Sequence, residues 1–385
     1  MTSNQAIFIQ SIADVQDALA SAQKVYPKGG GSKSALAKVD ARGQDVTLLE
    51  MGGLSGILIY QPDEYTFTAW AGTKVSEVEH ALSEHGQYLP FEPLWPHQGA
   101  TLGGTVASGL SGSGRYRYGG VRDFLIGTRF IDGQGDLILG GGKVVKNAAG
   151  FDSPKLLVGS LGRLGIMVEL TFKVFPRPKV FRTLAIPCTN IEEAVERLGK
   201  LAVAPLDVDA VDVDVTQGNG PTLTIRVGGL DSTLASRLER IQSLVGNGTI
   251  SQAQEEQSLW DNVRNFQWVP ADAAIVKVPL APSRLNELDQ HLANTGSVRR
   301  YTSGGHLCWL AWRKSIHQLE LLLEELSLSG LVIRWGKHDA EIQAESHNGL
   351  EGKETASIFL GKRQGTAFVQ RIKTGVDPQD RFVHL

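Results

Sequence analysis

Three glycine-rich stretches in the first 170 residues combine bare main chain with cationic side chains, a combination suited to binding anions. They are KGGGSK at 28–33, GATLGGTVASGLSGSGRYRYGGVRD at 99–123 and GSLGRLG at 159–165. Consecutive N–H groups in a glycine-rich turn can converge on an anion, and a lysine or hydroxyl beside them adds charge-assisted bonds to phosphate. The stretches predict a phosphate-binding site, with tight turns in a β-rich domain as the alternative.

The first stretch follows a short strand-like segment, KVY, but matches neither common nucleotide motif. A Walker A loop needs Gly-Lys followed by Ser or Thr, whereas Gly31 is followed by Ser32. The later GGGKVV fails as well, because Val144 stands where a hydroxyl is required. No G-x-G-x-x-G opens a helix after a strand, so a Rossmann site is not indicated.

Arg115 and Arg117 flank Tyr116 and are candidates for binding an acidic substrate. If the segment is extended, both guanidinium groups point the same way and could bind a substrate carboxylate bidentately, or a phosphate. An exposed basic loop or a contact patch between subunits is the alternative.

The elements that must position these residues form an α+β pattern in two domains. Amphipathic periodicity predicts a helix over 11–24, with Ser11 or Asp14 as its cap, and another over 73–87. Strands are predicted at 45–51, 56–62, 65–72 and 165–178, with a hairpin around DGQGD at 132–136.

The composition shifts at FPRP, residues 175–178, which indicates a domain boundary. Beyond it, strands are predicted at 208–215, 222–230, 273–280 and 303–312, and helices at 190–202, 232–245 and 315–329. The last stretch, AFVQRIKTGVDPQDRFVHL, is predicted to be turn-like. We therefore divide the chain into residues 1–178, 179–370 and 371–385.

Composition excludes several classes of protein. Net charge is −3, so nothing favours nucleic acid as a partner. Two cysteines, Cys188 and Cys308, cannot supply the four thiolates of an iron–sulfur cluster. The chain has no CxxC or HExxH motif, so no metal site is expected. No signal peptide or membrane span is visible, and a cytoplasmic protein is predicted.

The first ~178 residues resemble the FAD-binding PCMH-type (vanillyl-alcohol oxidase/p-cresol methylhydroxylase) family. KGGGSK, AGTKVSEVEHALSEHGQ, GATLGGTVASG and GSLGRLGIMVEL carry this resemblance. Within the family, LPFEP, RYGGVRDFLIG and KNAAGFD are most similar to the FAD-binding E subunits of glycolate oxidases (glycolate dehydrogenases). The resemblance implies a two-subdomain FAD-binding domain over 1–178, an α/β cap-like domain over 179–370, and a C-terminal segment that returns to the FAD domain.

The resemblance also implies residues that bind FAD, mostly through backbone atoms. They are Lys28, Gly29, Gly30, Gly31, Ser32, Lys33, Gly99, Ala100, Thr101, Leu102, Gly103, Gly104, Thr105, Gly109, Gly112, Gly162, Gly165 and Ile166. The flavin is expected to be non-covalent, because KGGGSK contains neither His nor Cys. Lys146 would lie near the flavin and stabilise its reduced, anionic ring, with a solvated lysine at a strand end as the alternative.

The implied function is the FAD-binding subunit of a glycolate dehydrogenase complex. Its partners would be a catalytic flavin subunit and an iron–sulfur subunit, its substrate a small hydroxy acid, and any attachment to the inner face of the membrane would be through those partners. The H.GDGN.H motif of catalytic relatives is absent, and the usual NPG[RK] ending is reduced to Asp377–Pro378. Two alternatives stay open: a stand-alone hydroxy-acid or alcohol oxidoreductase, and a scaffold that has lost its flavin.

Overall fold

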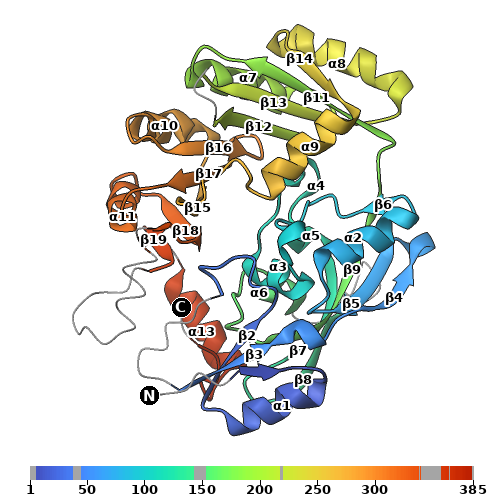
Figure 1. Cartoon of the computed structure of the whole chain (residues 1–385), viewed down its shortest axis with the longest axis vertical. Coiled ribbons are helices and arrows are strands. Elements are labelled where there is room, and N and C mark those ends of the chain that lie inside the picture. Colours follow the sequence, from blue (N-terminus) through green and yellow to red (C-terminus); the bar gives the residue numbers. More distant parts are fainter. Residues whose placement is uncertain are drawn as a thin grey trace. The chain divides into compact units, whose positions relative to one another are not determined.

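The computed structural model describes residues 6–37, 45–142, 153–216, 220–337, 339, 357–363 and 365–383 of the 385-residue chain. The chain divides into two compact units, coloured along the sequence in Figure 1. The first comprises Met1–Gly112, Gly119–Arg177 and Gln364–Leu385, and the second Ser113–Tyr118 and Pro178–Arg363. The candidate Lys146 lies outside the described residues.

The first unit begins with a small parallel sheet in the order β1-β3-β2, formed by Ala6–Phe8, Val46–Glu50 and Lys24–Lys28. Helix α1, Ile12–Ser21, connects β1 to β2. The predicted cap is confirmed: Ser11 Oγ accepts from Asp14 N at 3.1 Å, and Asp14 Oδ2 accepts from Ser11 N at 2.9 Å. This reciprocal pair satisfies two N–H groups that a helix start would leave without partners.

Replacing Ser11 with Ala should remove one side of this capping pair. We expect the free energy of unfolding to fall by about 1 kcal/mol, the usual effect of losing a serine cap. Urea unfolding of the variant measures this, and a midpoint equal to that of the wild type would contradict the role of the cap. Because α1 does not line the pocket described below, FAD content should stay unchanged.

A five-stranded antiparallel sheet follows, in the order β4-β5-β9-β7-β8. Its strands are Ile57–Gln61, Thr66–Trp70, Ile166–Lys173, Leu125–Ile131 and Leu137–Gly141. The predicted strands and the β7–β8 hairpin are confirmed. A short pair, β6 (Gln87–Tyr88) and β10 (Phe175–Pro176), also belongs to this unit. Its helices are α2 (Val75–Glu84), α3 (Leu102–Ser108), α5 (Val121–Phe124), α6 (Ser153–Leu157) and α13 (Thr366–Val376).

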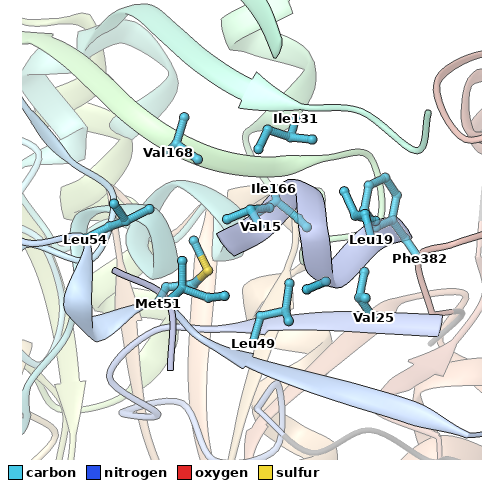
Figure 2. Close-up of a cluster of buried hydrophobic side chains, with 12 residues drawn as sticks. Val15, Leu19, Val25, Leu49, Met51, Leu54, Ile131, Ile166, Val168 and Phe382 are labelled. Carbon is cyan, nitrogen blue, oxygen red and sulfur yellow. The ribbon is translucent and has the colours of Figure 1, made fainter. Parts of the chain in front are cut away.

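A core of buried apolar side chains joins the two larger sheets of this unit (Figure 2). Val15 and Leu19 of α1 pack with Leu49 of β3 and with Ile166 and Val168 of β9. The spacing of Val15 and Leu19 by four residues places both on one helix face, as the sequence predicts. Burying each such side chain contributes about 1.5–3 kcal/mol, so this core stabilises the packing of the two sheets against each other.

The C-terminal stretch predicted to be turn-like instead contains helix α13. That prediction is wrong, because an i,i+4 ion pair supports the helix: Lys373 Nζ lies 2.6 Å from Asp377 Oδ2, and both groups are buried. Asp377 also accepts from the backbone N–H groups of Arg381 and Phe382. Phe382 is thereby placed in the core of the first unit.

The second unit contains a nine-stranded antiparallel sheet in the order β14-β11-β13-β12-β16-β17-β15-β18-β19. Its strands are β11 (Val180–Pro187), β12 (Ala210–Val215), β13 (Thr222–Gly229), β14 (Thr249–Gln252), β15 (Ala274–Pro279), β16 (Val298–Thr302), β17 (Leu307–Trp312), β18 (Ser329–Arg334) and β19 (Phe359–Gly361). Its helices are α4 (Arg115–Tyr118), α7 (Ile191–Val203), α8 (Asp231–Val245), α9 (Ala253–Arg264), α10 (Leu285–Ala293) and α11 (Ile316–Glu325). The predicted core strand is confirmed as β17, in which every residue is buried.

Candidate functional site

The three glycine-rich stretches line one pocket in the first unit. Lys28–Lys33 contribute a whole loop, α3 contributes one face, and the segment around Leu161 and Gly162 contributes a third wall. Main chain from three distant parts of the sequence thus surrounds a single space.

Most, but not all, of the predicted binding residues lie in this pocket. Those that line it are Lys28, Gly29, Gly30, Gly31, Ser32, Lys33, Thr101, Gly103, Gly104, Gly162 and Gly165. Those that do not are Gly99, Ala100, Leu102, Thr105, Gly109, Gly112 and Ile166. Ile166 is fully buried in the core shown in Figure 2, and Gly109 ends α3 with a φ of 64°. Both support the walls of the pocket from behind.

The loop at Gly29–Ser32 presents free hydrogen-bond donors to the pocket. Among the residues that the structure describes, none accepts a hydrogen bond from the backbone N–H groups of Gly29, Gly30, Gly31 or Ser32. Four consecutive donors at the wall of a pocket are therefore suited to an anion such as a pyrophosphate.

The start of α3 offers no such donors, although it also lines the pocket. Its first four N–H groups are all bonded within the protein. The pairs are Leu102 to Thr73 O, Gly103 to Ala71 O, Gly104 to Thr101 Oγ1 and Thr105 to Thr101 O. The side of this helix that lines the pocket carries only small side chains or none. We call this surface, formed by Gly103, Gly104, Ala107 and Ser108, the smooth side of α3. Such a surface can lie flat against a ligand without bonding to it.

The glycines of the pocket serve two different purposes. A Cβ on Gly29 would overlap Thr101 Oγ1, and one on Gly30 would overlap the carbonyl oxygen of Gly99. These two residues are glycine because the loop packs against the chain that precedes α3. A Cβ on Gly104 would meet only Thr101 Oγ1, at 3.1 Å, and would otherwise stand in the pocket. The fold therefore tolerates a side chain there, whereas a ligand on the smooth side of α3 does not.

The third wall is built from backbone conformations that side chains rarely adopt. Gly162 has a φ of 77° and Gly165 a φ of 147°. Leu161 has a φ of 54°, which is strained for a residue with a side chain. Its N–H donates to the carbonyl of Ala107 in α3 at 2.9 Å, so the strained turn is attached directly to the second wall.

Lys33 places a buried cation in the pocket. Its side chain is 7% exposed, and burial lowers the pKa of the ammonium group to about 8. Nζ lies 3.4 Å from Ser32 Oγ and 5.5 Å from the centre of the Trp95 ring. No carboxylate among the described residues pairs with it. A buried ammonium group without a counter-ion fits a pocket that receives an anion.

Several pocket residues were not identified from the sequence. They are Tyr26, Pro27, Leu36, Ala37, Met51, Ala71, Ala107, Ser108, Leu161 and Met167. Tyr26 donates from its hydroxyl to the Leu36 carbonyl, and burial raises its pKa to about 12. Met51 directly follows β3 and belongs to the buried core, and Met167 lies within β9, so no local pattern distinguishes them as pocket residues. The apolar lining suits the flat rings of a dinucleotide.

Arg115 and Arg117 lie in a helix, not in an extended segment, so the expectation of two parallel guanidinium groups is wrong. Residues two apart on a helix do not face each other. Arg117 is 3.5 Å from both Asp207 and Asp209, and is thus engaged by carboxylates. Arg115 pairs with no carboxylate among the described residues, and its charge, after burial, lowers the pKa of Lys277 to about 8.

Comparison with known proteins identifies the expected cofactor. A family model described as FAD binding domain matches residues 4–140. The glycolate oxidase subunit GlcE of Escherichia coli (strain K12) is 34% identical over 276 residues, which are 70% of this chain and 75% of that subunit. The glycolate oxidase subunit GlcD of Bacillus subtilis (strain 168) is 27% identical over 249 residues, 61% of this chain and 52% of that subunit.

More distant similarities cover less of the relative or show the fold alone. A D-2-hydroxyglutarate dehydrogenase of Xanthomonas citri is 32% identical over 181 residues, 46% of this chain but only 38% of that enzyme. Two solved structures of alkyldihydroxyacetonephosphate synthase, at 16% identity, cover 97% of this chain and 74% of theirs, with TM-scores of 0.65 and 0.67. They share the fold of both units.

Fold and pocket together define an FAD-binding protein of the PCMH type, and the expected fold class is confirmed. The residues present fit the cofactor: four free N–H donors and a buried cation suit its phosphates, and apolar walls suit its rings. The chain belongs to the family of the glycolate oxidase subunit GlcE and is an FAD-dependent oxidoreductase.

Proposed function

We propose that this chain is the FAD-binding subunit of a complex that oxidises a small 2-hydroxy acid, glycolate, to the 2-oxo acid. Two electrons leave the substrate with two protons, and an iron–sulfur subunit receives the electrons. When bound, FAD supplies the chemistry that accepts a hydride and releases electrons singly. The names of the relatives, glycolate oxidase subunits and a hydroxy-acid dehydrogenase, support this assignment.

The observation that carries the proposal is the pocket with its unpartnered donors and buried Lys33. The loop at Gly29–Ser32 would bind the pyrophosphate, Lys33 would neutralise part of its charge, and the smooth side of α3 would lie against the rest of the cofactor. A scaffold that no longer bound flavin would gain nothing from a buried cation without a counter-ion, since burial of an unpaired charge is destabilising.

Electron transfer through a partner follows from the cysteines. The chain has two, which is fewer than an iron–sulfur cluster needs. Both are buried, and burial raises the pKa of the Cys308 thiol far above its usual value, which keeps it protonated. Iron–sulfur clusters would therefore belong to another subunit. No helix in the described part of the chain has the length and apolar character to cross a membrane.

Arg115 is our candidate for binding the substrate carboxylate. Unlike Arg117, it has no carboxylate partner among the described residues, and Lys277 adds a second cation close enough to interact with it. Replacing Arg115 with Gln should raise the KM for the hydroxy acid about 10-fold or more, the effect of losing one charge-assisted hydrogen bond, while FAD content stays constant.

Expression with and without companion subunits tests the function. We expect the chain alone to purify with FAD and to reduce an artificial dye only when a GlcD-type flavin subunit and an iron–sulfur subunit are co-purified and glycolate is added. Glycolate-dependent dye reduction by the chain alone would instead establish a stand-alone oxidoreductase. A colourless protein that takes up no added FAD would establish a scaffold and overturn the proposal.

A further inference from the structure

Leu161, in the third wall of the pocket, has a backbone conformation that its own side chain disfavours. Its φ is 54°, and the other residues of the same segment with a positive φ, Gly159, Gly162 and Gly165, are all glycine. A side chain in this left-handed region crowds its own backbone, whereas a glycine adopts the conformation freely. The turn therefore carries a leucine at a position whose backbone conformation favours glycine.

The conformation of this turn is imposed by its hydrogen bonds to α3. Gly159 N donates to the Val106 carbonyl at 3.0 Å, and Leu161 N donates to the Ala107 carbonyl at 2.9 Å. Both carbonyls belong to the last turn of α3, where a helix leaves its C=O groups without partners from within the helix. The turn thus satisfies the end of the helix through backbone N–H groups. A glycine at position 161 could donate the same hydrogen bond, so these bonds do not require a leucine.

The side chain of Leu161 adds to the apolar part of the pocket lining. Leu161 lines the pocket together with Met51 and Met167. Apolar side chains make favourable dispersion contacts with flat aromatic rings. FAD contains two such ring systems, the flavin and the adenine, so the cofactor offers a partner that would reward a leucine in this wall.

We propose that the side chain of Leu161 contacts a ring of bound FAD, and that this contact is the reason for a leucine at a strained position. Strained backbone conformations gather at ligand sites because the surrounding structure enforces them. The proposal rests on the assignment of FAD to this pocket. A leucine that only packed against the protein would make a different prediction, because its loss would destabilise the apoprotein without changing the affinity for FAD.

Two substitutions separate the contact from the strain. Leu161→Ala removes the contact and keeps the strained φ, whereas Leu161→Gly removes both. Each should bind FAD about 10-fold more weakly in a titration of the apoprotein, because each loses the same buried apolar contact. The Leu161→Gly apoprotein should melt at a higher temperature than Leu161→Ala, the reverse of the usual order of these two residues. Leu161→Met keeps an apolar side chain of similar volume and should bind FAD nearly as tightly as wild type.

Tyr65 provides the matched control. It lies in the same unit, directly after the short helix η2 (Pro62–Glu64), has a φ of 52° and is outside the pocket. Tyr65→Gly should also melt above Tyr65→Ala, because the backbone strain is of the same kind. Neither variant should change the affinity for FAD.

Competition by ADP, which has the adenine and pyrophosphate but no flavin, identifies the ring. If Leu161→Ala weakens ADP as much as FAD, the leucine contacts the adenine, and if it weakens FAD alone, the leucine contacts the flavin. Both results support the contact.

Two results overturn the contact while the pocket stands, provided that Lys33→Gln weakens FAD. One is wild-type affinity in Leu161→Ala, and the other is a much larger loss in Leu161→Gly than in Leu161→Ala, which would assign the effect to backbone freedom. Wild-type affinity in both Leu161→Ala and Lys33→Gln would overturn the assignment of FAD to this pocket, and the contact with it.

Discussion

The Gly104→Val variant should fold like the wild type and lose FAD. The structure places only Thr101 Oγ1 near a Cβ on Gly104, at 3.1 Å, so this capping hydroxyl need shift by only a few tenths of an ångström and the protein itself accommodates the side chain. The ligand cannot, because the valine would occupy the space above the smooth side of α3. We expect FAD affinity to fall by about 100-fold, the upper end of the cost of overpacking by about 1–3 kcal/mol, since neither the helix backbone nor the cofactor can withdraw.

Titration of the apoprotein with FAD, followed by flavin fluorescence, measures this loss, and the melting temperature of the apoprotein reports on folding. Gly199→Val is the matched control: Gly199 also lies in a helix, α7, and a Cβ there meets nothing within 4 Å. Unchanged FAD affinity in Gly104→Val would show that the cofactor does not lie against α3. A matching loss in Gly199→Val would show that the valine acts through the helix and not through the pocket.

Helices and strands with strong periodicity were predictable from the sequence, and elements held by distant contacts were not. Helix α1 was predicted together with its cap because Ser11 and Asp14 satisfy each other locally. Helix α3 was not, because Gly103 and Gly104 suggest a loop, and its first N–H groups depend on Ala71 and Thr73, about thirty residues earlier in the chain. Helix α13 likewise depends on the burial of Lys373 with Asp377, which sequence spacing alone does not reveal.

The pocket could be predicted in outline, whereas the reason for each glycine could not. The three glycine-rich stretches indicated the three walls of the pocket. Residues without a side chain are needed wherever a backbone approaches another backbone or a ligand closely. Sequence does not say which of these applies. Gly30 is required by the carbonyl of Gly99, whereas a Cβ on Gly104 would stand in the pocket. The division of the chain was also only partly visible, since nothing in the sequence of Ser113–Tyr118 indicates that these residues belong to the second unit.

Lys33 should make FAD binding depend on pH in the alkaline range. Burial lowers the pKa of its ammonium group to about 8 in the absence of ligand, and a bound pyrophosphate would raise that pKa, because opposite charges stabilise each other. Below pH 8 the lysine is charged before FAD arrives, so affinity is constant. Above pH 8 binding must include uptake of a proton, so affinity should fall by about tenfold per pH unit until the raised pKa of the complex is reached.

The Lys33→Gln variant separates this charge from every other effect of pH. At pH 7 it should bind FAD about 10- to 100-fold more weakly than wild type, the contribution of a hydrogen bond to a charged group. It should show no alkaline decline of its own, so the two affinities converge as pH rises. Calorimetry in buffers of different ionisation enthalpy should detect proton uptake above pH 8 in the wild type and none in the variant.

The control is Lys74→Gln, because Lys74 is an exposed lysine outside the pocket. Its affinity for FAD should match that of the wild type at every pH. A wild-type affinity that stays flat above pH 8, or an alkaline decline that persists in Lys33→Gln, would place the phosphates away from Lys33, because only a cation that gains its charge on binding couples FAD to a proton at this pH.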